Sequence, residues 1–63
     1  MDFRKIVQEV ADAYGIETQA LEGGNFSIPQ WQILYPLAEQ FEKTGSEEDA
    51  RRYIEQKAKL LTA

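Results

Sequence analysis

Cysteine and histidine are both absent from this sequence of 63 residues. Without cysteine the chain forms no disulfide, and without either residue it lacks the preferred ligands of a structural zinc site. The commonest general base and the thiol nucleophile are missing as well. We therefore expect a protein that is not an enzyme, that holds no metal or cofactor, and whose fold depends on packing alone.

Long apolar runs are also missing, since none approaches the 18 residues that a membrane-spanning helix needs. The N-terminal segment has an amphipathic pattern, unlike the short continuous apolar stretch of a secretory signal. Together with Met1, this predicts a complete short reading frame and a cytoplasmic location. The length corresponds to a single small domain, residues 1–63.

Positive charge is absent between Ile6 and Glu42, and the net charge of the chain is −4. The acidic residues of this stretch are Glu9, Asp12, Glu17, Glu22, Glu39 and Glu42. Such a surface repels the phosphates of nucleic acids and of anionic lipids. Arg52 and Lys59 lie beside acidic neighbours and form no continuous basic stripe. We expect no membrane or small-molecule partner and disfavour nucleic-acid binding.

Apolar residues recur at helical spacing near both ends of the chain, which predicts helices over residues 3–14 and 47–61. Asp2 and Ser46 are suitable N-caps, and Gly15 stands where a left-handed residue ends a helix. The two apolar stripes consist of Phe3, Ile6, Val7, Val10 and Tyr14, and of Ala50, Tyr53, Ile54, Ala58 and Leu61.

A third helix is predicted over residues 28–43, because Ser27 and Gln30 have the spacing of a capping box. Pro36 removes a backbone hydrogen bond there, so this helix is either kinked or divided into two shorter helices. We favour the kink because the apolar stripe keeps its phase across the proline. The stripe consists of Ile28, Trp31, Leu34, Tyr35, Ala38 and Phe41.

The connection between the first two long helices has room for a short helical turn over residues 17–22, closed by Gly23 and Gly24. Such a turn is stable only if Ile16 and Leu21 pack on the core. No segment alternates with a period of two residues. The predicted fold is therefore an all-α, small three-helix bundle, either antiparallel or an open helical hairpin crossed by the third helix.

About a third of the chain resembles the helix-turn-helix unit of tetratricopeptide repeats. The residues that carry this resemblance are Leu37, Ala38, Phe41, Gly45, Ala50 and Ile54, and only one copy of the unit is present. The resemblance implies that helices 28–43 and 47–61 pack antiparallel.

Few residues remain that could act in catalysis or bind a metal ion. The two serines occupy cap positions, and no lysine is flanked by an apolar run that would desolvate it and lower its pKa. Acidic pairs one turn apart, such as Glu39 and Glu42, are interpreted as solvated helix faces because hard cations need more oxygen ligands.

Ile33 and Leu37 are the informative residues, because they project from the side of helix 28–43 opposite its main apolar stripe. One interpretation is that this helix lies in the middle of the bundle and is buried on both faces. The other is an exposed patch that meets a partner. Trp31 has the same ambiguity, and its position near Phe26 favours the core.

We expect a non-catalytic protein–protein interaction module, a small acidic regulator, adaptor or inhibitor that binds a basic or apolar protein surface. The predicted binding residues are Gln30, Trp31, Ile33, Leu37, Glu39, Gln40 and Glu42. Two alternatives remain open, an acidic mimic of nucleic acid and a structural subunit that binds its own copies.

Overall fold

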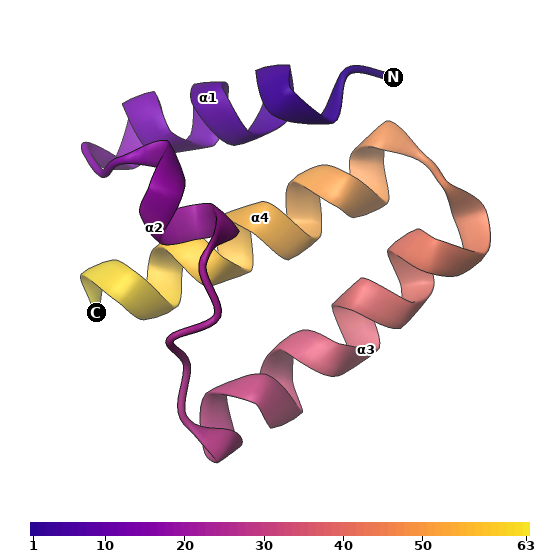
Figure 1. The fold of residues 1–63 in the computed structure, drawn as a ribbon. Coiled ribbons are helices and arrows are strands. Elements are labelled where there is room, and N and C mark those ends of the chain that lie inside the picture. The colour runs from indigo at the N-terminus through magenta and orange to yellow at the C-terminus, as the bar shows by residue number, and fades with distance from the viewer.

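The computed structural model describes residues 1–63 as four helices without a strand (Figure 1). The helices are α1 (Phe3–Tyr14), α2 (Thr18–Glu22), α3 (Ile28–Thr44) and α4 (Glu47–Thr62). The prediction of an all-α bundle is confirmed, and the three long helices begin and end within one residue of the predicted bounds. The short turn before Gly23 is formed as α2.

Local capping signals explain where the helices begin. The Asp2 carboxylate accepts a hydrogen bond from the backbone N–H of Lys5, and the Ser46 hydroxyl accepts one from Asp49. Ser27 and Gln30 exchange both hydrogen bonds of a capping box. These contacts satisfy backbone N–H groups that have no partner inside the helix, so the sequence alone sets these boundaries.

Pro36 lies inside α3, which continues without a break from Ile28 to Thr44. The alternative of two shorter helices on either side of the proline is therefore wrong. The apolar stripe that keeps its phase across Pro36 holds both halves against α4, which offsets the missing backbone hydrogen bond.

Helix α4 is the centre of the molecule, because it packs against α1, α2 and α3, whereas the α3 backbone approaches only α4. Figure 1 shows α3 and α4 as an antiparallel hairpin, with α1 on the other side of α4 and running in the same direction as α4. The interpretation that helix 28–43 is the middle helix is wrong. The middle position belongs to α4 because α2 and the connection after it carry the chain around the C-terminal half of α4.

The core lies between α1, α2 and α4. Its fully buried side chains are Ile6, Val7, Val10, Ala11, Leu21, Ala50, Ile54 and Ala58. Phe3 of α1 reaches α3, where its ring stacks on Phe41 with centroids 5.6 Å apart. Leu34 is the one fully buried residue of α3 and lies outside this cluster.

Three residues that the apolar stripes predicted to be buried are exposed in the structure: Ile28, Tyr35 and Leu61. Each lies at the edge of its stripe or near a helix end. Because the α3 backbone approaches only α4, the centre of its stripe is covered and the edge that carries Ile28 and Tyr35 remains open to solvent.

Candidate functional site

The outer surface of α3 carries three large apolar side chains in contact with solvent. Ile28 is 76% exposed, Tyr35 57% and Ile33 49%. Leu37, which was predicted to share a patch with Ile33, is partly buried. A helix that packed on both faces would cover these side chains, so their exposure follows from the position of α3 at the edge of the molecule.

The predicted binding residues do not form one continuous patch. A helix turns by about 100° per residue, so they divide into two flanks of α3, on either side of the line that contacts α4. One flank consists of Gln30, Ile33, Leu37 and Gln40, which we call the glutamine flank. The other consists of Ile28, Trp31, Tyr35, Glu39 and Glu42, which we call the aromatic flank.

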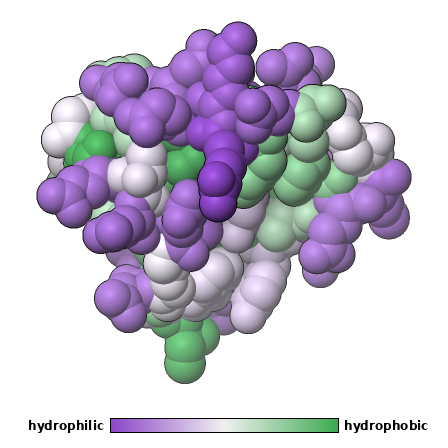
Figure 2. All heavy atoms as spheres, turned by 45° about the horizontal axis from the view of Figure 1, so that its top comes forward, coloured by the Kyte–Doolittle hydropathy of each residue, from purple (hydrophilic) through white to green (hydrophobic).

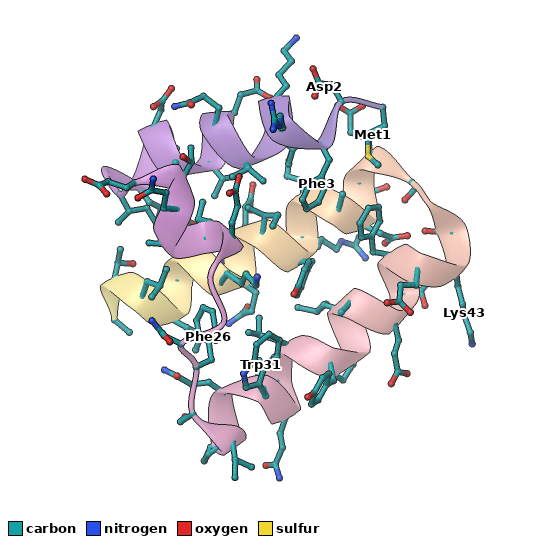
Figure 3. The ribbon with its side chains drawn as sticks, viewed as in Figure 1. Met1, Asp2, Phe3, Phe26, Trp31 and Lys43 are labelled. Atoms are coloured by element: carbon teal, nitrogen blue, oxygen red, sulfur yellow. The ribbon has the colours of Figure 1, made fainter.

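Aromatic rings form a row at the start of the aromatic flank. The Phe26 ring meets Trp31 edge to face at a centroid distance of 5.6 Å, and the Trp31 ring stacks on Tyr35 at 5.4 Å. Figure 3 shows Phe26 and Trp31 together in the space between the start of α3 and the C-terminal half of α4. Trp31 is only partly buried, so it fills this space and also reaches the surface.

Lys57 of α4 lies behind these rings and is the only charged residue that is buried, with 5% of its surface exposed. Its Nζ donates a hydrogen bond of 2.9 Å to the carbonyl oxygen of Leu21. The same Nζ lies 4.9 Å from the ring centre of Tyr53 and 5.8 Å from those of Phe26 and Trp31. The ammonium is thus held by one carbonyl and three aromatic rings.

Burial lowers the pKa of Lys57 from its ordinary value of 10.5, and the charge of Glu22 opposes this shift. Burial also raises the pKa of Tyr53 above 10.0, with a smaller contribution from Glu42 of α3. The expectation that no lysine is desolvated is therefore wrong. The rings around the ammonium belong to Phe26 and Trp31, which are far away in the sequence, and to Tyr53, one turn earlier in α4.

Other polar features explain local structure. The hydroxyl groups of Thr44 and Ser46 donate hydrogen bonds to the Asp49 carboxylate and lower its pKa, which completes the start of α4. Arg51 of α4 forms an ion pair with Glu9 of α1, with 3.0 Å between Nη2 and Oε1. No three acidic side chains converge as a metal site would require.

The opposite side of the molecule is polar. Figure 2 brings the α1 side forward and shows mainly hydrophilic side chains over that helix. The only pocket is an open depression near the start of α2, and its lining residues are Gln8, Ile16, Glu17, Thr18 and Gln19. Neither feature combines a reactive group with an enclosed space.

Comparisons with protein families, with curated proteins and with solved structures found no match to this chain. None of the four helices is both long and apolar enough to cross a membrane. The function therefore has to be inferred from the surfaces described above, of which the outer surface of α3 is the most distinctive.

Proposed function

We propose that this protein is a non-catalytic protein-binding module, a small regulator, adaptor or inhibitor that contacts a larger protein through the outer surface of α3. The observation that supports this most strongly is the exposure of Ile28, Ile33 and Tyr35 on a helix whose backbone approaches only α4. Burying what is still exposed of each side chain contributes less than the roughly 1.5–3 kcal/mol of a complete burial, so a partner would have to span both flanks of α3 to gain from all three.

The charge around this surface favours a basic partner. No lysine or arginine occurs between Ile6 and Glu42, and Glu39 and Glu42 are exposed on α3, whose single basic residue is Lys43 in the last turn. In such an interface, charge steers the encounter and apolar contacts set the lifetime of the complex. Binding suits these residues better than catalysis, because Lys57, the one desolvated amine, is enclosed and already hydrogen bonded.

Mimicry of nucleic acid has less support. The six acidic residues between positions 6 and 42 are divided among α1, α2, α3 and the connection after α1. One of them, Glu9, is paired with Arg51. A mimic needs a regular row of unpaired charges, and its binding would weaken steeply between low and moderate salt.

Photo-crosslinking tests the proposal. A photoreactive amino acid replaces Ile33 in one variant and Arg52 in a matched control, because Arg52 is exposed on the side of α4 away from its neighbours. We expect crosslinking in cells to join position 33, and not position 52, to one protein with a basic surface. A crosslink only to a second copy of the chain would indicate self-association instead, and no crosslink at position 33 would contradict the proposal.

A further inference from the structure

The segment between α1 and α3 lies against the C-terminal half of α4 (Figure 1). Its residues 17–26, which we call the strap, comprise α2 and the connection after it. We propose that the strap opens and closes as a unit while α1, α3 and α4 stay folded, and that Lys57 keeps it closed. This inference goes beyond the proposed function, because it concerns access to the interior of the protein and not the outer surface of α3.

A single hydrogen bond joins the strap to the other parts of the protein. Nζ of Lys57 donates it to the carbonyl oxygen of Leu21 over 2.9 Å. The backbone hydrogen bonds of residues 17–26 all run within the strap, and neither ion pair of the protein includes a residue of the strap. Lys57 is therefore the only polar attachment of the strap.

The Leu21 carbonyl depends on this bond. Leu21 is 0% exposed, so water does not reach its carbonyl oxygen while the strap is closed. Helix α2 ends at Glu22, and no backbone N–H bonds to this oxygen. A buried carbonyl without a donor is costly, and opening of the strap would return it to water. The ammonium of Lys57 consequently favours the closed state.

Little else holds the strap in place. Helix α2 has five residues, and its N-cap Glu17 makes no side-chain capping bond. A helix this short is not stable without tertiary contacts. Leu21 is the only fully buried residue of the strap, and Phe26, which is partly buried, lies with its ring centre 5.8 Å from Nζ of Lys57. The strap is thus the part of the chain that opens most readily.

Both ends of the strap are fixed by motifs that do not require it to be closed. Gly15 ends α1 with a φ of 66° and donates hydrogen bonds back to that helix. At the other end, Ser27 forms its capping box with Gln30 inside α3. Helices α1 and α3 each pack directly on α4. The strap can therefore leave α4 while the three long helices remain together.

Opening changes the surroundings of Lys57. The Leu21 carbonyl and the Phe26 ring move away with the strap, whereas Trp31 and Tyr53 stay on α3 and α4. The Lys57 side chain, which is 5% exposed in the closed state, then meets solvent. The strap controls access to the only buried charge of the protein.

Hydrogen exchange of the full chain, followed by NMR, tests whether the strap opens by itself. The amides of Ala20 and Gly23 are hydrogen bonded within the strap, and Ile54 and Ala58 represent the buried side of α4. We expect the two strap amides to exchange at least about tenfold faster than those of α4, after correction for intrinsic rates. Equal protection would overturn the proposal, because the strap would then open only when the whole protein unfolds.

Lys57→Met removes the donor and the charge, and Lys59→Met, which removes an exposed charge from the same helix, is the matched control. We expect exchange of the strap amides to become at least about tenfold faster in Lys57→Met, with the amides of α4 changed less than about twofold. Lys59→Met should exchange as the wild type does. Unchanged strap amides in Lys57→Met, or equal acceleration in α4, would overturn the role of Lys57.

Gly24→Ala should have the opposite effect. A Cβ at Gly24 meets nothing within 4 Å and its φ is not positive, so alanine fits the closed strap and lowers the entropy of the open one. We expect acetylation of Lys57 by N-hydroxysuccinimide acetate, followed by mass spectrometry, to slow by about two- to fivefold. Acetylation of the exposed Lys59 should not change. Wild-type Lys57 that reacts as fast as Lys59, or is unaffected by Gly24→Ala, would overturn the proposal.

Discussion

Lys57 shows what a single residue can do in so small a domain. Its position repeats the spacing of the buried stripe, three residues after Ile54 and seven after Ala50, so periodicity places it on the buried side of α4. Its charge, by contrast, predicts a side chain that is exposed to solvent. The ammonium is tolerated there because it has a carbonyl partner and three rings around it.

This burial predicts how stability depends on pH. The folded pKa of Lys57 lies below its ordinary value of 10.5, so in the interval between the two the unfolded chain holds a proton that the folded chain has lost. The free energy of unfolding therefore rises with pH through this interval. Tyr53 has the opposite effect above pH 10.0, because its folded pKa is raised and the unfolded chain loses its proton first.

The pH effect of Lys57 can be separated from that of Tyr53 by urea unfolding of the wild type and of Lys57→Met at roughly pH 8 and pH 10. Tyr53 is present in both proteins, so its effect cancels in the comparison. We expect the stability of the wild type relative to Lys57→Met to increase with pH. A difference that stays constant or decreases would show that Lys57 is not desolvated in the folded protein.

At the scale of the element, α3 contains a residue, Pro36, that disfavours a helix. Pro36 offers no N–H to the carbonyl of Gln32, four residues earlier, and its ring crowds that carbonyl. The helix is nevertheless continuous, because Leu34 is fully buried against the rest of the protein and Trp31, Ala38 and Phe41 are partly buried.

Replacing the proline tests how much Pro36 destabilises the folded protein. Pro36 is exposed, so Pro36→Ala restores the backbone hydrogen bond without disturbing the core. We expect the free energy of unfolding to increase by about 2 kcal/mol, the helix penalty of proline reduced by the greater entropy that alanine gives the unfolded chain. The measurement is urea unfolding followed by circular dichroism. A loss of stability would mean that the proline is needed for the shape of α3.

At the scale of the whole molecule, the structure depends on α1 being held against α4. Of the eight buried side chains of the core cluster, α1 contributes Ile6, Val7, Val10 and Ala11, and α3 contributes none. The hairpin of α3 and α4 is therefore held together by few buried apolar contacts of its own, although the two helices are neighbours in sequence.

A chain that lacks residues 1–15 should consequently not fold. Each lost side chain contributes about 1.5–3 kcal/mol, except for the smaller Ala11, and a domain of this size has only about 3–5 kcal/mol in total. We expect thermal melting of the truncated chain, followed by circular dichroism, to lack a cooperative transition. A chain that lacks only the exposed residues 62–63 is the control and should melt as the full chain does. Cooperative melting of the truncated chain would show that the hairpin folds alone.

The sequence by itself determined the helices, because caps, left-handed glycines and apolar periodicity act within a few residues of one another. Ser27 with Gln30, and Gly15 with a φ of 66°, specify their structures wherever the helix packs. The tertiary structure decided which helix is central, and with it which apolar residues stay exposed. Periodicity shows that a helix has an apolar side but not how many neighbours cover it, so Ile28 and Tyr35 at the edge of the α3 stripe could not be assigned from spacing alone. The surroundings of Lys57 come from four segments, which are α2, the connection after it, the start of α3 and α4 itself. Only their packing brings the Leu21 carbonyl and the rings of Phe26 and Trp31 to the ammonium.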